Sequence, residues 1–214
     1  MLKKEHIEKR LTRSFFAVSM ITAIAAVVGL IAIIVISNRY SYALTNFGFA
    51  QGDIGKAMME FADVRSSLRA AIGYDEEDVI AQVTQQHKDS TAAFEKYFAE
   101  IERTIVSEDG RETYDAIKAE LDKYWELDTR IMELGATTDR ELCKQAQDIA
   151  INELADVYNS IYSKLNDLLE VKVEQGNGLS SGLIFISIIL AVVNAAVIAA
   201  AVVASMKIGK DNAK

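Results

Sequence analysis

Two long apolar runs bracket the chain, and a segment of mixed polar and apolar residues separates them. The runs start at residues 15 and 183, have 22 residues each, and contain no charged residue and no proline. As a helix, each reaches about 33 Å, enough to cross the roughly 30 Å apolar layer of a bilayer. The first run is longer than the core of a cleaved secretory signal, and no small-x-small cleavage site follows it. The pattern predicts transmembrane helices over residues 15–36 and 183–205.

Between the runs, apolar residues recur in alternating steps of three and four, the repeat of helices that pack into a bundle. No alternating apolar and polar run of the strand type is flanked by turn residues. Asp75 is placed to cap the second helix, and Thr138 with Glu141 forms a capping box for the fourth. The sequence predicts an all-α protein, an antiparallel up-down four-helix bundle over residues 37–182 on two transmembrane helices. The four expected helices cover residues 38–73, 75–107, 109–135 and 138–178.

The same spacing predicts which side chains face the bundle core. Two of them, His87 and Asp128, are polar. We expect a hydrogen-bonded core histidine, with a pH-sensing or metal-binding imidazole as the alternative, and an aspartate in a polar layer that fixes register. The inward-facing positions are Ile54, Ala57, Phe61, Val64, Leu68 and Ala71, then Ile80, Val83, His87, Ser90, Phe94, Tyr97, Ile101 and Thr104, then Tyr114, Ile117, Leu121, Tyr124, Asp128 and Ile131, then Leu142, Ile149, Leu154, Tyr158, Ile161, Leu165 and Leu168.

Charge is distributed unevenly along the chain, which carries −8 overall. The leader over residues 1–14 has a net charge of +3, the tail over residues 206–214 has +2, and the segment between them has −13. Basic residues flank the cytoplasmic ends of membrane spans, so both termini are predicted in the cytoplasm and the bundle outside a cell membrane crossed twice. A domain this acidic is not expected to bind nucleic acid.

The residues that usually carry chemistry are scarce. The chain has one cysteine, Cys143, and two histidines, so no disulfide and no cluster of metal ligands is expected. We expect Cys143 to be a small surface or half-buried residue. No phosphate-binding loop, dinucleotide fingerprint or hydrolase motif is present in the sequence. The sequence therefore predicts a protein that is not an enzyme, with no catalytic residue, no cofactor and no metal site.

One stretch and the order of segments resemble a known family. Residues 61–69 read FADVRSSLR, and the chain from residue 10 to 206 resembles the sensor half of bacterial methyl-accepting chemotaxis proteins. The resemblance implies a membrane receptor, acting as a homodimer, that detects a small carboxylate or amino acid outside the cell. It also implies Arg65 and Arg69 as candidates for binding the ligand carboxylate across the dimer interface. The alternative is a solvated helix face whose arginines pair with nearby acidic residues. The start of the fourth helix, from Thr138 to Gln147, is expected to supply partner groups.

The resemblance stops at the second span. Members of that family continue into a linker and a long cytoplasmic coiled coil, whereas this sequence lacks that signalling part and ends at Lys214. We expect either a truncated receptor or one that acts through a cytoplasmic signalling partner. The alternative function is a membrane-tethered helical scaffold that contacts membrane lipid and binds another protein without sensing a small molecule.

Overall fold

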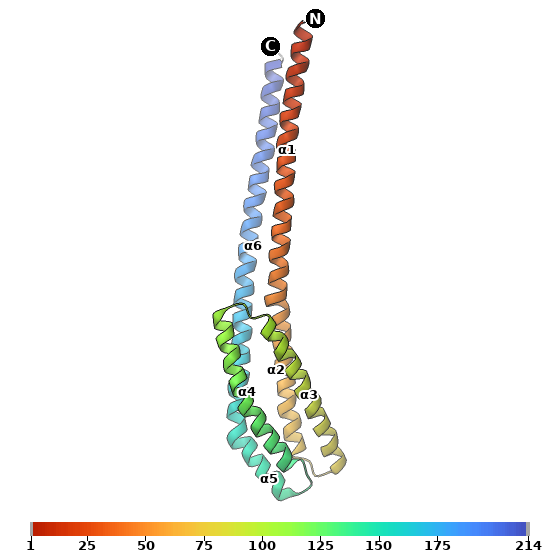
Figure 1. Cartoon of the computed structure of the whole chain (residues 1–214), viewed down its shortest axis with the longest axis vertical. Helices are drawn as coiled ribbons and strands as arrows, with labels where there is room; N and C mark the ends of the chain where they lie inside the picture. Colours follow the sequence, from red (N-terminus) through yellow and green to blue (C-terminus); the bar gives the residue numbers. More distant parts are fainter. Residues whose placement is uncertain (1, 213–214) are drawn as a thin grey trace. The chain divides into compact units, whose positions relative to one another are not determined.

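The computed structural model describes the backbone of residues 2–212, and this part of the chain contains helices and no strand. The all-α prediction is confirmed. In two places the helix widens into a short π-helix, written η, in which each hydrogen bond spans five residues. The elements are α1 (Leu2–Ala43), η1 (Leu44–Gly48), α2 (Phe49–Ala71), α3 (Glu77–Arg103), α4 (Glu108–Gly135), α5 (Arg140–Ile149), η2 (Ala150–Leu154) and α6 (Ala155–Asn212) (Figure 1).

The chain divides into two compact units. One unit joins residues 1–42 with residues 178–214, and the other comprises Ala43–Asn177. In the first unit the two helices run side by side, and the start of α1 and the end of α6 lie at the same end of the pair (Figure 1). Within the described residues, two helices are long and apolar enough to cross a membrane. The first unit is thus consistent with a two-span membrane protein.

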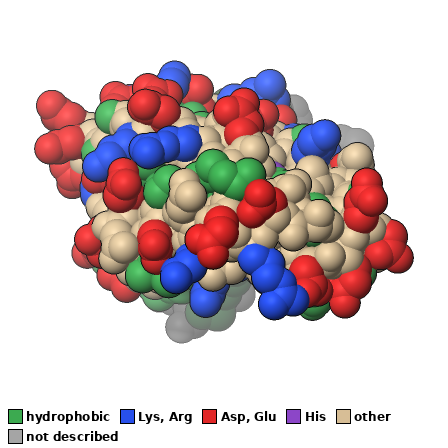
Figure 2. All heavy atoms as spheres, turned by 90° about the horizontal axis from the view of Figure 1, so that it is seen from below, with side chains coloured by type: hydrophobic (Ala, Val, Ile, Leu, Met, Phe, Trp, Pro, Cys, Tyr) green, Lys and Arg blue, Asp and Glu red, His purple; other side chains and the backbone are tan. Residues whose placement is uncertain are grey.

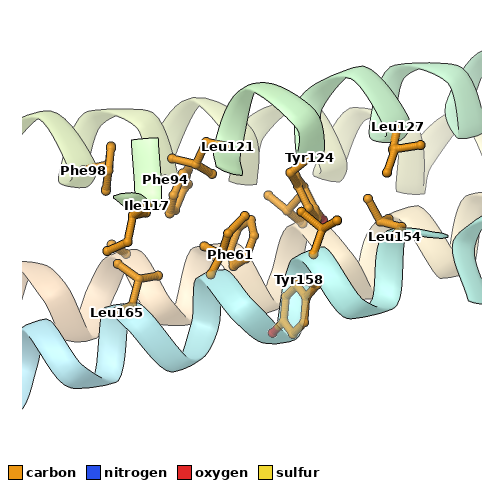
Figure 3. Close-up of a cluster of buried hydrophobic side chains, with 14 of the residues drawn as sticks. Phe61, Phe94, Phe98, Ile117, Leu121, Tyr124, Leu127, Leu154, Tyr158 and Leu165 are labelled. Atoms are coloured by element: carbon orange, nitrogen blue, oxygen red, sulfur yellow. The ribbon is translucent and has the colours of Figure 1, made fainter. Parts of the chain in front are cut away.

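The second unit is a four-helix bundle in which α5, η2 and the start of α6 together form the fourth helix. One large aromatic side chain from each of the four helices meets at its centre: Phe61, Phe94, Tyr124 and Tyr158 (Figure 3). The centroid of the Phe61 ring lies 5.0 Å from that of Phe94, 4.7 Å from that of Tyr124 and 4.9 Å from that of Tyr158. Offset and tilted rings at these distances attract one another beyond their burial. This aromatic layer holds the four helices together.

The spacing of apolar residues predicted most of this core. Every inward-facing position expected in the first and third helices is buried. In the fourth helix the prediction for Leu142 is wrong, because 36% of this side chain is exposed. The helix begins at Arg140 and turns Cys143 and Ala146 inward instead. Cys143 is therefore buried, not half-buried as expected, and its thiol donates to the carbonyls of Gly135 and Thr137.

Two helix starts differ from the sequence prediction. Asp75 does not cap α3: the capping position falls on Glu76, which makes no side-chain capping bond, and Asp75 pairs with Arg140 at 2.6 Å. Asp139 replaces Thr138 as the cap of α5, and its carboxylate accepts bonds from the backbone amides of Glu141 and Leu142 at 3.0 and 3.3 Å. An aspartate caps a helix as well as a threonine does, so the helix begins one residue later than expected.

Gly135, the last residue of α4, permits a close approach between helices. A methyl group at this position would lie 2.4 Å from Ala146 Cβ and 2.8 Å from Ile72 Cγ2. Overpacking of this kind destabilises a core by about 1–3 kcal/mol. We therefore expect Gly135→Ala to lower the free energy of unfolding by that amount, measured by urea denaturation of the whole chain in detergent.

Gly52 provides the matched control. It lies inside α2, and a methyl group there would meet no atom within 4 Å. Alanine is favoured over glycine in a helix by roughly 0.5–1 kcal/mol. Gly52→Ala should therefore stabilise the bundle slightly, and equal effects of the two substitutions would contradict the tight packing at Gly135.

Candidate functional site

Two adjoining cavities lie between α2 and the fourth helix. The larger has a volume of about 260 Å³ and the smaller about 170 Å³. Both are bordered by Arg69 of α2 and by Ala150 and Ile151 of η2. Leu68, Leu154 and Ala155 make the smaller cavity apolar, and none of the described residues that line either cavity is acidic. The arrangement suits a small molecule with an apolar body and an anionic group.

The two arginines predicted from the sequence, Arg65 and Arg69, both line the smaller cavity. They lie four residues apart and so share one face of α2. Arg65 is half-buried, and its guanidinium lies 4.2 Å from the centre of the Tyr158 ring. Burial raises the pKa of Tyr158, while the charge of Arg65 and its hydrogen bond to the phenol act in the opposite direction. Arg65 is thus held against the aromatic layer.

Arg69 is different, because its side chain is exposed at the rim of both cavities. Among the described residues it makes no side-chain hydrogen bond and no ion pair. A guanidinium carries five N–H donors in a fork that matches a carboxylate. Arg69 is therefore the group best placed to bind an anion here.

The two weaker candidates of the fourth helix separate in the structure. Gln147 lines the larger cavity, and its side-chain amide donates to the backbone carbonyl of Ile72 at 2.8 Å. That bond ties the fourth helix to the end of α2. Thr138 is exposed in the turn before α5 and lines neither cavity. The structure brings Arg65, Arg69 and Gln147 to the cavities and leaves Thr138 outside.

The π-helix η2 supplies three lining residues that the sequence prediction did not single out as binding residues: Ala150, Ile151 and Leu154. A π-helix inserts one extra residue into the helical repeat and often marks a functional site. The insertion leaves Ile151 68% exposed beside Arg69, although its side chain is large and apolar. The sequence signal for η2 is the step of five residues from Ile149 to Leu154, in an apolar pattern that otherwise repeats in steps of three and four.

The surface at the end of the bundle carries side chains of both charges, with acidic ones prominent (Figure 2). Figure 2 shows Asp and Glu side chains spread over the end, with Lys and Arg side chains between them and a small hydrophobic patch near the middle. An anion approaching this end is repelled at long range. Any attraction of an anion to the cavities therefore has to come from the local charge of the arginines that line them.

The second unit is an all-helical bundle with two cavities between its first and fourth helices. A family model described as a four-helix bundle sensory module for signal transduction matches residues 4–181. The chain belongs to this family of chemoreceptor-type sensor domains, which is a signal-transduction family and not an enzyme family. No curated protein and no solved structure matches the chain.

Proposed function

We propose that the chain is the sensor of a membrane receptor, that its bundle lies outside the cell, and that it binds a small carboxylate between α2 and η2. The observation that carries this proposal is Arg69, a guanidinium without an ion pair among the described residues, at the mouth of an apolar cavity. The basic leader and tail support a topology with both termini in the cytoplasm. Membership in a sensory family supports the signalling role.

The lining also supports a choice among carboxylates. Two guanidinium groups and apolar side chains surround the space, and the described lining residues include no carboxylate to pair with an ammonium group. The ammonium of an amino acid would lie near two positive charges and lose part of its hydration. Carboxylates with a short aliphatic body therefore bind more tightly than amino acids of the same size.

Transmission uses the continuity of α6. This helix begins next to the cavity at Ala155 and runs without a break to Asn212, through the predicted span over residues 183–205. A ligand that binds one packing of the bundle more tightly than another shifts the equilibrium between them. The shift is carried along α6 into the span, from which a homodimeric receptor passes it to a cytoplasmic partner protein.

The ligand proposal predicts a specific stabilisation of the bundle. Trp125 is the single tryptophan and packs against the aromatic layer, so its fluorescence reports unfolding of the bundle and not of the spans. In the whole chain in detergent, a bound carboxylate at a hundred times its Kd should add about 2.7 kcal/mol to the free energy of unfolding. The panel to titrate comprises short aliphatic monocarboxylates, dicarboxylates and the matching amino acids.

Variants of Arg69 separate binding from general charge effects. A hydrogen bond to a charged group contributes about 1.5–3 kcal/mol, so we expect Arg69→Gln to weaken carboxylate binding by at least about tenfold and Arg69→Lys to weaken it less. Arg103→Gln is the control, because Arg103 is exposed on α3 and pairs with Glu100 at 2.8 Å. No stabilisation by any carboxylate, or equal stabilisation in the Arg69→Gln variant, would contradict the proposal.

A further inference from the structure

A second polar cluster is buried in the bundle, apart from the residues that line the ligand cavities. It consists of Ser67 on α2, His87 on α3 and Asp128 on α4, which are 3%, 6% and 5% exposed. His87 Nε2 lies 2.9 Å from Asp128 Oδ2. On the other side of the ring, Nδ1 lies 3.1 Å from the Val64 carbonyl and 3.2 Å from Ser67 Oγ. The expected core histidine with hydrogen bonds is confirmed, and it joins three helices.

The partners of His87 suit its charged form. Asp128 and the Val64 carbonyl only accept hydrogen bonds, so a ring that bonds to both donates from both nitrogens and is an imidazolium. Burial disfavours this charged form, but the hydrogen bond and charge of Asp128, together with the Val64 carbonyl, outweigh it and raise the pKa of His87 above 6.5. The ring in the folded protein therefore keeps its proton to a higher pH than an unperturbed histidine does.

Loss of that proton requires a different set of hydrogen bonds. The neutral ring keeps its Nε2–H on Asp128, and Nδ1 becomes an acceptor that can no longer serve the Val64 carbonyl. The Ser67 hydroxyl, which donates to the Asp63 carbonyl at 2.7 Å, is close enough to rotate and donate to Nδ1. Each protonation state thus has its own bonds between α2 and α3.

The cluster is reached from the surface through a groove of about 310 Å³ between α3 and α4, which both His87 and Asp128 line. The charged groups around the ring are Asp128 and Glu133 on α4 and Lys88 on α3. Among the described residues, α2 presents to the ring the Val64 carbonyl and the Ser67 hydroxyl. Asp128 Oδ1 and the hydroxyl of Tyr124, one turn away on α4, are both buried and have no hydrogen-bond partner in the part of the chain that the structure describes. Asp128 thus faces the ring with its charge only partly satisfied.

We propose that the His87–Asp128 pair is a proton-binding site through which acidity biases the packing of α2, α3 and α4. This proposal rests on the proposed function only because it places the source of the proton outside the cell. The proton is a second input to the bundle, independent of the carboxylate at Arg69. Because its test uses no carboxylate, failure of the ligand proposal leaves the test unaffected.

The test follows His87 directly by nitrogen NMR of the whole chain in detergent with labelled histidine. His6→Gln leaves His87 as the only imidazole, since the chain has two histidines. We expect one titration with a midpoint above pH 6.5 and a neutral form protonated at Nε2. Asp128→Asn should lower the midpoint by about one pH unit or more, because an adjacent opposite charge is lost. Asp122→Asn, on the exposed face of the same helix, should leave it unchanged.

The effect on packing is measured by urea unfolding followed through Trp125. The pKa of His87 is higher in the folded chain than in the unfolded chain, so protonation of this residue adds to the free energy of unfolding. This contribution is fully present below pH 6.5 and is lost as the pH rises through the folded-state pKa. We expect this loss in the wild type and its absence in His87→Gln, read as the difference between the two profiles. Absence of a titration between pH 5 and 9, a neutral ring protonated at Nδ1, an unchanged midpoint in Asp128→Asn, or equal pH profiles would each overturn the proposal.

Discussion

Phe61→Ala is expected to lower the free energy of unfolding of the bundle by about 3–5 kcal/mol, a large share of the 5–15 kcal/mol typical of a folded domain. Phe61 is fully buried and lies within 5.0 Å of one ring from each of the three other helices. Truncation removes the central member of the aromatic layer and leaves a cavity where four helices meet. Urea denaturation of the whole chain in detergent, followed by Trp125 fluorescence, measures the loss.

The matched control is Met59→Ala on the same helix. The side chain of Met59 is 68% exposed, and surface substitutions usually change stability by less than about 0.5 kcal/mol. A similar, small effect of both substitutions would show that the aromatic layer does not hold the helices together.

The second large effect is expected at Lys172, whose side chain is 1% exposed. Its ammonium donates to the carbonyl of Asn46 in η1 at 3.2 Å and to the carbonyl of Thr104 at the end of α3, and lies 5.6 Å from the centre of the Phe47 ring. No carboxylate pairs with it among the described residues. Burial lowers the pKa of Lys172 from 10.5 to about 8.

This shift predicts how stability depends on pH. Between pH 8 and 10.5 the unfolded chain holds the proton of Lys172 and the folded chain does not, so the free energy of unfolding rises with pH by about 1.4 kcal/mol per unit. The total over this window is about 3.5 kcal/mol. It arises because the neutral amine keeps two N–H donors for the two carbonyls and no longer buries a charge. Below pH 8 both states are protonated, and the contribution is flat.

Lys172→Met removes the titrating group while keeping a flexible apolar side chain. The difference in unfolding free energy between wild type and this variant should grow in favour of the wild type from pH 8 to 10.5. Lys164→Met is the control, since Lys164 on the same helix is partly exposed and binds Glu120 at 2.9 Å. Parallel pH profiles of wild type and Lys172→Met would rule out a buried, uncompensated ammonium.

Much of the fold follows from residue spacing alone. The three-and-four repeat through Phe61 and Tyr124 placed the core, because only side chains on one face of a helix can be removed from water. The breaks at Gly73 and Gly135 placed the ends of the first and third helices near where α2 and α4 end. His87 and Asp128 were recognised as polar residues in core positions, but their contact across two helices is a tertiary feature that no spacing encodes.

The two π-helices mark where the local pattern was insufficient. The predicted fourth helix is interrupted by η2, which aims Ala150 and Ile151 at the arginine face of α2. In the same way, η1 presents the Asn46 carbonyl to Lys172, a residue that the spacing alone gave no reason to expect inside. A one-residue insertion changes the direction in which the side chains around it point. Because tertiary packing decides where such an insertion occurs, these contacts became visible only in the structure.

In the proposed receptor, a carboxylate bound at Arg69 changes the arrangement of the two spans. Disulfide formation between one cysteine placed within residues 15–36 and another within residues 183–204 measures this directly, in a Cys143→Ser background that removes the native thiol. We expect a stabilising carboxylate to change the disulfide yield at some cysteine pairs in membranes, and we expect Arg69→Gln to abolish this change. Identical patterns with and without the carboxylate, across all pairs, would contradict it.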